Sequence, residues 1–320
     1  MLQRLTTVLL LVACVAVTAA GQAARPLTLV GQVRAALNEK DFARAEALVA
    51  AERREKGDTP EALAALSWLA RGAQADRRAA DAEKLAIEAQ SLAVKALGKR
   101  SPDDDANLAA AIGAGIEVQA QLGVDRGERS SAIAFLEREL ATYAGTALGK
   151  RIQKNINLLT LEGRPAPPLE RNEWIGTVQP PALADLKGKV VVVFFWAHWC
   201  PDCKVEGPIL QKLYEKYRTQ GLTIVAPTMR FGYVAGGKAA PPDEELRYIV
   251  QIRDQFYPWL AELPTPVSAA NHQRYGVSST PTLAIVDRSG VIRTYNPGRL
   301  TEADLETRIT ALLDRATAER

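Results

Sequence analysis

The sequence has little cysteine, histidine or methionine, and its first half has few aromatic residues. Only three cysteines and two histidines occur among 320 residues. Of the 19 aromatic residues, four precede residue 171, whereas positions 31–150 hold 31 alanines. Basic residues outnumber acidic ones by only 40 to 37, with no local run of Lys or Arg, so we expect no nucleic-acid partner. The uneven composition, in a chain about twice the length of an ordinary domain, predicts two domains of different kinds.

The first residues have the pattern of an export signal. Arg4 precedes an apolar run over residues 5–17, and small residues follow it. The run is too short for a membrane span, which needs about 20 residues. We therefore expect a signal peptide over residues 1–24 and a periplasmic or secreted protein. The residues ending at Cys14 also resemble a bacterial lipobox, so a lipid anchor on Cys14 is the alternative.

Residues 25–162 are alanine-rich, and their apolar residues recur at helical spacing. Breaks occur at Gly57–Pro60 and at Gly98–Pro102. The motif Ala45-Glu46-x-Leu48 recurs 37 residues later as Ala82-Glu83-x-Leu85, close to the spacing of tetratricopeptide helix pairs. We expect an all-α domain, either a small helical bundle or a tetratricopeptide-like array that binds a protein partner.

A proline-rich linker at Gly163–Pro168 cannot continue a helix and opens a second domain over residues 163–320. Strand and helix patterns alternate after it, which is typical of an α/β fold. The β-branched and aromatic run Lys189–Trp196 predicts a central strand buried on both faces. The other expected elements are helices at 201–218, 243–260 and 301–316, and strands at 222–225, 282–286 and 291–295.

The motif Cys200-Pro201-Asp202-Cys203 follows the buried strand directly. A zinc site needs about four nitrogen or sulfur ligands, and without Cys14 the chain has only two cysteines and two histidines, so we expect no metal. A disulfide across a two-residue gap removes little chain entropy, which makes a purely structural bond a poor explanation. Redox chemistry is the interpretation that we favour.

The expected position of the motif assigns a role to each cysteine. Cys200 would lie at a helix N-terminus, where free N–H groups and the helix dipole stabilise a thiolate. Cys203, one turn into the helix, is placed to attack a mixed disulfide on Cys200 and release the substrate. Pro201 in the first turn loses no hydrogen bond that the helix needs. We predict Cys200 as the nucleophile and Cys203 as the resolving cysteine.

With these residues, positions 163–318 resemble the thioredoxin superfamily, and within it the exported TlpA/ResA-like thiol–disulfide oxidoreductases. The resemblance implies an α/β thioredoxin-like fold and exchange with protein dithiols and disulfides, without a bound cofactor. The direction of exchange stays open, because fold and motif allow a reductant fed by a membrane electron donor, an oxidase or an isomerase. The residues that carry the resemblance are Gly163–Pro167, Asp185–Val190, Phe195–Cys203, Glu206, Pro208, Tyr275–Thr282 and Val286–Gly290.

The resemblance also implies a substrate-binding loop. Thr280-Pro281 would have a cis peptide bond and pack beside the disulfide, and its backbone would pair with a substrate strand. Trp199 and Pro201, which flank Cys200, are assigned to substrate binding as well.

The chain departs from the family at Phe194, where thioredoxin has a buried aspartate and TlpA-like proteins often have asparagine. The usual proton acceptor for Cys203 is therefore missing. Glu206 and Asp202 are the remaining candidates for a proton relay, and the alternative is that both are solvated helix carboxylates. His198 would either tune the thiolate or play no part.

Two other functions remain as alternatives. A peroxiredoxin-type peroxidase shares the fold, but its peroxidatic cysteine follows a Pro/Thr pattern that Ala197-His198-Trp199 lacks. A redox-inactive scaffold would use only the helical half, and the intact Cys-x-x-Cys motif argues against it.

Overall fold

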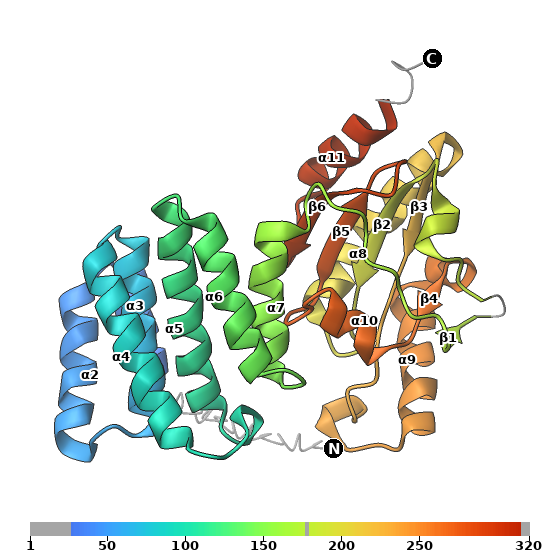
Figure 1. Cartoon of the computed structure of the whole chain (residues 1–320). Coiled ribbons are helices and arrows are strands. Elements are labelled where there is room, and N and C mark those ends of the chain that lie inside the picture. Colours follow the sequence, from blue (N-terminus) through green and yellow to red (C-terminus); the bar gives the residue numbers. More distant parts are fainter. Residues whose placement is uncertain (1–26, 177–178, 315–320) are drawn as a thin grey trace, which may run out of the picture.

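The computed structural model describes residues 27–176 and 179–314 (Figure 1). The predicted signal peptide and Cys14 lie outside these residues. Within the described ranges, no helix combines the length and the apolar character that crossing a bilayer requires.

The first half of the described chain is entirely helical, which confirms the all-α prediction. Its alanines explain how the helices pack without large side chains. A Cβ atom on Gly115 of α5 would lie 2.7 Å from the backbone oxygen of Ala86 in α4, so these two helices meet almost at backbone contact. The helices are α1 (Leu29–Asn38), α2 (Phe42–Lys56), α3 (Pro60–Ala75), α4 (Ala79–Leu97), α5 (Ala106–Asp125), α6 (Arg129–Thr142) and α7 (Ala147–Thr160).

The helices form three hairpins, α1–α2, α3–α4 and α5–α6. Within each hairpin, the loop that joins the two helices has the same geometry. Each loop has one residue with positive φ, namely Lys40, Arg77 and Gly127. The next residue donates its N–H five residues back, in the bonds Asp41 to Ala36, Arg78 to Ala73 and Glu128 to Gly123. Five residues after the positive-φ position comes a buried alanine, at Ala45, Ala82 and Ala132.

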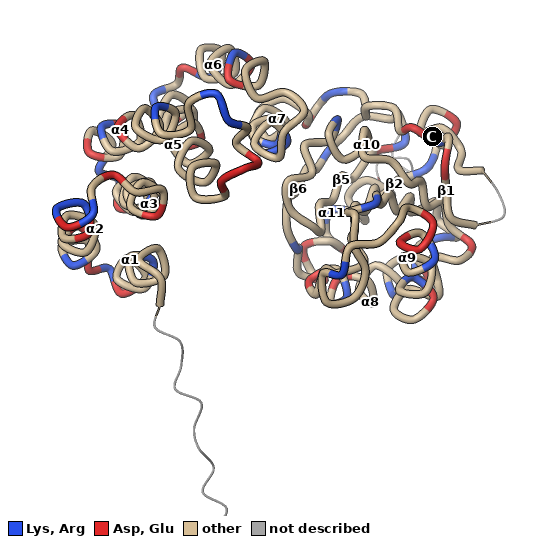
Figure 2. The backbone as a smooth tube through the Cα atoms, turned by 90° about the horizontal axis from the view of Figure 1, so that it is seen from below, with Lys and Arg blue, Asp and Glu red and all other residues tan. Residues whose placement is uncertain are grey.

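The hairpins form a curved array. Figure 2 shows α1, α3, α5 and α7 along the inner side of an arc, with α2, α4 and α6 outside them. The motif copies that begin at Ala45 and Ala82 occupy the same place in successive hairpins.

The second half is built on a four-stranded sheet with the strand order β3-β2-β5-β6. Strand β2 is parallel to β3 and antiparallel to β5, and β5 is antiparallel to β6. The short strands β1 and β4 pair separately. The elements are β1 (Trp174–Ile175), β2 (Val190–Phe195), α8 (Pro201–Tyr217), β3 (Leu222–Val225), α9 (Pro242–Phe256), β4 (Thr265–Pro266), α10 (Ala269–Arg274), β5 (Thr282–Val286), β6 (Ile292–Pro297) and α11 (Glu302–Asp314).

All six residues of β2 are buried, as the sequence predicted for a central strand. Successive side chains of a strand point to opposite faces of the sheet. Val190, Val192 and Phe194 share a core with residues of α8, α9 and α11. The alternate residues of β2 pack on the other face with Tyr275 and Leu161, which precedes the linker.

The largest boundary error concerns the helix expected over 243–260. Helix α9 ends at Phe256, and a short 3₁₀ segment follows from Pro258 to Glu262, because proline cannot supply the N–H that would continue the helix. The two-residue strands β1 and β4 and the six-residue helix α10 were not predicted, since segments this short show no periodicity.

The proline-rich segment after α7 ends that helix at Thr160, as expected, but it is not a free spacer. Gly163 donates its N–H to the backbone oxygen of Ile292, and Ile292 donates in return to Arg164, both at 2.9 Å. Ala166 makes the same kind of bond to Gly290. The segment therefore runs along β6 as an additional edge of the second half.

Helix α7 is fastened to the second half by a very close contact at Gly276. A Cβ atom at this position would lie 2.4 Å from the backbone nitrogen of Lys154, and φ of Gly276 is +60°. Only glycine fits such an approach without strain. Asn157 adds a hydrogen bond to the backbone oxygen of Arg274, so the last helix of the first half is packed against both Gly276 and its neighbours.

Candidate active site

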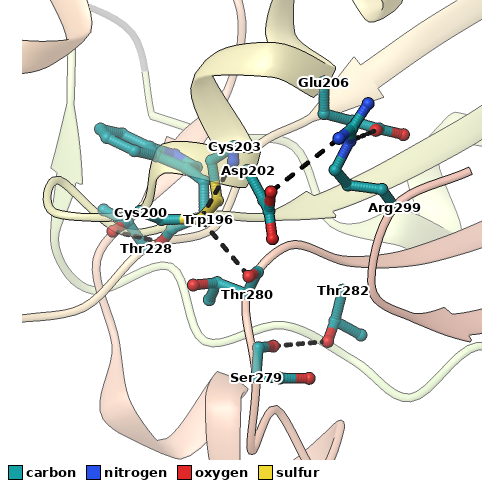
Figure 3. Close-up of a disulfide and its surroundings, with 10 residues drawn as sticks. All are labelled: Trp196, Cys200, Asp202, Cys203, Glu206, Thr228, Ser279, Thr280, Thr282 and Arg299. Carbon is teal, nitrogen blue, oxygen red and sulfur yellow. Dashed lines mark hydrogen bonds and ion pairs between the residues drawn. A yellow bond between two sulfur atoms is a disulfide. The ribbon is translucent and has the colours of Figure 1, made fainter. Parts of the chain in front are cut away.

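The two cysteines lie where the buried strand β2 gives way to helix α8. Cys200 is the N-cap residue of α8 and Pro201 is its first helical residue, as predicted. The sulfur atoms of Cys200 and Cys203 form a disulfide, and both residues are buried (Figure 3). The local sequence explains this placement, because proline is favoured in the first turn of a helix and cannot extend the preceding strand.

The surroundings of the Cys200 sulfur match those of an activated thiol. The backbone N–H of Cys203 donates to Sγ of Cys200 at 3.0 Å. This N–H belongs to the first turn of α8, whose free N–H groups form the positive end of the helix dipole. On its other side, Sγ of Cys200 lies 3.3 Å from the backbone oxygen of Thr280.

The loop at Thr280-Pro281 has the cis peptide bond that the resemblance implies, and it packs beside the disulfide. Thr282 Oγ1 donates to the backbone oxygen of Ser279 at 2.8 Å. Gly298 donates its N–H to the backbone oxygen of Pro281. These bonds fix the loop at both ends. The side-chain Oγ1 of Thr280 is buried and has no hydrogen-bond partner among the described residues.

Trp196 anchors the end of β2 beneath the cysteines. Its Nε1 donates to the backbone oxygen of Ala226 at 3.0 Å, and its own backbone oxygen accepts from Thr228 Oγ1 at 2.9 Å. The indole ring meets the ring of Tyr257 edge to face, with centroids 5.3 Å apart.

The core around Cys203 is aromatic. Phe194, Trp196 and Tyr257 pack in the same buried cluster as both cysteines. Tyr257 also lies against Gly207 of α8, where a Cβ atom would be 2.6 Å from its ring. Burial raises the pKa of Tyr257, and its hydroxyl has no hydrogen-bond partner within the described residues. The sequence did not single out Tyr257.

The two carboxylates proposed as relays differ sharply in exposure. Glu206 is fully buried, so the alternative of a solvated carboxylate is wrong for this residue. Its Oε1 accepts the N–H of Leu300 at 3.4 Å, and Arg299 Nε lies 3.7 Å from Oε2. Burial raises the pKa of Glu206, and the Leu300 N–H and Arg299 only partly offset this effect. Asp202 is exposed and lies 3.9 Å from Arg299, which suits a solvated carboxylate (Figure 3).

His198 is buried rather than a surface residue at the strand end. Its Nε2 lies 3.3 Å from Oε1 of Glu245, a residue of α9 that no motif in the sequence singles out. Glu245 also accepts the backbone N–H groups of Phe231 and Gly232, so it fixes the loop that covers the histidine. Burial, with a smaller effect of Lys204, lowers the pKa of His198, against the opposite influence of Glu245. The histidine is therefore neutral at neutral pH.

The surface next to the cysteines exposes apolar side chains. Trp199 is 45% exposed and Val205 is 47% exposed, and Pro201 is exposed between them. The ring of Trp199 rests edge to face on Phe231, with centroids 5.5 Å apart. This surface adjoins the cysteines along the chain, and the Thr280 loop lies beside the disulfide. In the described ranges, no group of three or more His, Cys, Asp or Glu residues is arranged to hold a metal ion.

A mixed sheet with a Cys-x-x-Cys motif at the N-terminus of a helix and a cis-proline loop beside it defines a thioredoxin-like domain. The predicted fold of the second half is thus confirmed. A model of the AhpC/TSA family matches residues 163–235, which include both cysteines.

Among curated proteins, the second half is similar to a thioredoxin-like protein and to thiol–disulfide oxidoreductases of bacilli. It is 29% identical over 148 residues to the thioredoxin-like protein YneN of Bacillus subtilis, a match that covers 46% of this chain and 78% of YneN. It is 30% identical over 128 residues to the thiol–disulfide oxidoreductase ResA of Bacillus thuringiensis, covering 39% of this chain and 64% of ResA.

Solved structures with a similar fold come from other bacteria. A thiol:disulfide interchange protein of the thioredoxin family from Chlorobium tepidum is 22% identical, with a TM-score of 0.36, and the match covers 48% of this chain and 99% of that one. The exposed lipoprotein thioredoxin Etrx1 of Streptococcus pneumoniae is 22% identical, with a TM-score of 0.35, over 45% of this chain and 100% of that one.

Proposed function

We infer that the protein is a thiol–disulfide oxidoreductase that exchanges disulfides with other proteins through Cys200 and Cys203. The observation that carries this inference is the position of Cys200, at a helix N-cap and 3.3 Å from the backbone oxygen of the cis-proline loop. The similarity to YneN and ResA supports it. The proposal includes two domains, a helical one over residues 25–162 and a thioredoxin-like one over residues 163–320.

The exchange proceeds through a mixed disulfide. In the reduced protein, the thiolate of Cys200 attacks one sulfur of the substrate disulfide, and the other substrate sulfur leaves as a thiolate that takes up a proton. The thiolate of Cys203 then attacks Sγ of Cys200, restores the Cys200–Cys203 disulfide and releases the second substrate thiol. Two electrons pass from the protein to the substrate, and the reverse sequence oxidises a substrate dithiol.

Two features favour Cys200 as the attacking thiolate. The Cys203 N–H and the helix dipole stabilise negative charge on its sulfur, which lowers the pKa of a thiol at such a position. Both cysteines are buried, but Cys203 lies one turn deeper in α8 than the N-cap residue Cys200, which places its thiolate to attack Sγ of Cys200 in the mixed disulfide.

Glu206 is the residue that we assign as proton acceptor for Cys203. Residues three apart on a helix are neighbours, so its side chain and that of Cys203 share one face of α8. Its raised pKa lets it hold a proton closer to neutral pH than an ordinary carboxylate. Its Oε2 has no hydrogen-bond partner among the described residues, although Arg299 Nε lies 3.7 Å away, so this oxygen can accept the proton of Cys203.

A substrate strand would lie between the two surfaces that border the disulfide. Backbone groups of Thr280 pair with the strand, and the buried Oγ1 of Thr280 offers it a further donor or acceptor. Trp199 and Pro201 supply exposed apolar contacts from the other side.

The helical half recruits the protein whose disulfide is exchanged. Its three hairpins with identical loop geometry support a tetratricopeptide-like array, which offers a concave surface to a partner. The export pattern of residues 1–24 supports a location outside the cytoplasm, and a lipid anchor on Cys14 is the alternative to a cleaved signal peptide. If the protein works as a reductant, its electron donor is a membrane protein.

The experiment that tests the function is a reductase assay with insulin and dithiothreitol, in parallel with a peroxide-consumption assay. Disulfide reduction that depends on Cys200, without peroxide turnover, supports the proposal. Peroxide turnover would favour the peroxiredoxin-type alternative, and inactivity in both assays would favour a redox-inactive scaffold. The reduction potential of the Cys200–Cys203 pair then decides between a reductant and an oxidant.

A further inference from the structure

The inner side of the helical arc contains two adjoining cavities of about 300 and 420 Å³. Trp68 and Arg71 of α3 line both cavities, so the two adjoin at these side chains and we treat them as one depression. The first extends to α1, and the second crosses α5 and α7 to reach Ser278 and Ser279 of the sheet half. We call this depression the inner groove, and its defining residues are Arg34, Lys40, Trp68, Arg71, Arg151 and Lys154.

Positive charge predominates in the inner groove. Its lining includes five basic residues but only two acidic ones, Asp76 and Glu117. Glu117 is held by three cations at once, since Arg71, Arg151 and Lys154 all bind its carboxylate at 2.5–3.1 Å. One carboxylate cannot neutralise three cations, so charge is left over for an anion from outside.

The protonation of these groups is consistent with excess positive charge. Desolvation opposes ionisation of Glu117, but Arg151 and Lys154 outweigh it and hold the pKa of Glu117 far below its usual range. Burial lowers the pKa of Arg71, and repulsion from Arg151 and Arg34 adds to this effect while Glu117 acts against it. A bound carboxylate would relieve that repulsion.

Trp68 adds an aromatic ring to the inner groove, and two of the guanidinium groups lie over this ring. The guanidinium of Arg34 lies 4.6 Å from the centre of its ring, and that of Arg71 lies 5.1 Å from it. Gly113 of α5 contributes to the same surface, because a Cβ atom there would be 2.5 Å from Arg151 Nη1. The small residue lets the Arg151 side chain lie across α5.

The inner groove reaches the loop that contacts the disulfide. Ser279, in its wall, is followed by Thr280, whose backbone oxygen lies 3.3 Å from Sγ of Cys200. We propose that the inner groove binds an extended acidic segment of the substrate protein and thereby delivers that protein's disulfide to Cys200. This inference rests on the proposed exchange function and adds the site and the charge of the partner.

The dimensions suit such a segment. Neighbouring packed helices are about 8–10 Å apart, so the three steps from α1 to α7 span roughly 24–30 Å. An extended chain advances about 3.3 Å per residue, so about eight residues cover that distance. Exposed charges attract over about 8 Å at physiological salt, which makes the attraction sensitive to ionic strength.

The probes are synthetic peptides that share one disulfide-bearing end and differ only in an eight-residue extension. The extension contains four Glu in the acidic peptide, four Gln in the neutral one and four Lys in the basic one. Full-length protein is assayed for kcat/KM of disulfide reduction with each peptide. We expect the acidic peptide to exceed the neutral one at least tenfold, the basic peptide to fall below it, and the differences to shrink in 0.5 M salt.

The variant R34E/K40E reverses two charges in the first cavity, and R44E/R54E makes the same change in net charge on exposed positions of α2, on the outer side of the arc. R34E/K40E should bring the acidic-to-neutral ratio close to one, whereas R44E/R54E should keep it. An equal ratio in both variants, or no preference in the wild type, would overturn the inference.

A cysteine-free acidic peptide separates this inference from the proposed function. Its binding, followed by the anisotropy of an uncharged label, requires no exchange chemistry. Binding that R34E/K40E weakens at least tenfold and R44E/R54E preserves supports the inner groove, even if no peptide disulfide is reduced. Reduction of all three peptides at the same rate without binding would support the exchange function and reject the groove.

Discussion

The two halves of the chain treat their buried polar groups in opposite ways. In the helical half, Glu117 is partly buried, and its carboxylate is engaged by Arg71, Arg151, Lys154 and Asn155. By contrast, every buried side-chain atom that lacks a hydrogen-bond partner in the described ranges lies between residues 206 and 288. Such unsatisfied groups are costly, and they persist where a fold serves chemistry. The described helical half leaves no such atom, whereas those of the sheet half include atoms of Tyr257 and Thr280, which pack around the disulfide.

The same contrast holds for packing. Alanine and glycine bring the helices of the first half close together, whereas aromatic and β-branched side chains fill the core of the second. The two halves meet at Gly276, which lies against the backbone of α7. Most basic residues of the inner groove lie on one side of this contact, and the disulfide lies on the other.

The largest expected effect concerns the cysteine that we place at the centre of the chemistry. Cys200→Ser should lower the rate of insulin reduction by at least about a thousandfold, since the nucleophile is lost. Ile87→Ser, an exposed position on α4, is the matched control on the helical half and should keep the wild-type rate. Comparable losses in both variants would break the division of roles between the halves.

The joint between the halves predicts the largest effect on stability. Gly276→Ala should cost about 2–5 kcal/mol, because a positive φ costs about 1–2 kcal/mol and overpacking a further 1–3 kcal/mol. Gly57→Ala is the control, since Gly57 also has a positive φ but a methyl group added there would meet nothing within 4 Å. Urea unfolding of both variants measures the difference. Equal losses would mean that α7 is not held tightly against Gly276.

The buried His272 should make the stability of the sheet half depend on pH. Burial lowers the pKa of His272 to about 4, whereas the unfolded chain binds the proton near 6.5. The unfolded state therefore binds more protons over this interval, and stability is lost as the pH falls from about 6.5 toward 4. The loss attributable to His272 reaches about 3 kcal/mol.

His272→Gln removes the titrating group and should flatten this dependence. Four of the five tryptophans lie in the sheet half, so denaturant unfolding followed by tryptophan fluorescence at pH 7 and pH 4.5 reports on it. If wild type and variant lose equal stability between these pH values, His272 is not the responsible group.

The smallest expected effect concerns the proton of Cys203. General acid–base catalysis contributes about 10²–10⁴-fold, but water remains as a second acceptor, so we expect Glu206→Gln to slow mixed-disulfide resolution by about tenfold near pH 7. The deficit should shrink as the pH rises and hydroxide takes over. Asp202→Asn, on the same helix but exposed, is the control and should leave the pH profile unchanged. An unchanged profile in Glu206→Gln would assign the proton to solvent.

Glu206→Gln also has a predicted effect on stability. Because burial raises the folded-state pKa of Glu206 above that of the unfolded chain, ionisation of this residue costs stability as the pH rises through the folded-state pKa. The change in stability from pH 4.5 to pH 7, measured by urea unfolding, should therefore be more favourable in the variant than in the wild type, and the opposing contribution of His272 is present in both.

Local signals in the sequence located the parts of the site that follow one another along the chain. The buried strand, the helix start at Cys200 and the loop at Pro281 each have a short motif that depends on nearby residues. The partners of these residues could not be predicted. Glu245 is 47 residues from His198, and Arg299 is 93 residues from Glu206, so only the folded chain brings them together. The contact of Lys154 with Gly276 is of the same kind.

The most direct test of the central claim is the trapping of mixed disulfides. Purified Cys203→Ser and Cys200→Ser variants are reduced, mixed with a disulfide-bearing protein, quenched by alkylation and examined by non-reducing electrophoresis and mass spectrometry. Attack by Cys200 with resolution by Cys203 predicts that Cys203→Ser accumulates a covalent adduct through Cys200, whereas Cys200→Ser forms almost none. Equal adducts in both variants, or an adduct only through Cys203, would contradict the roles assigned to the two cysteines.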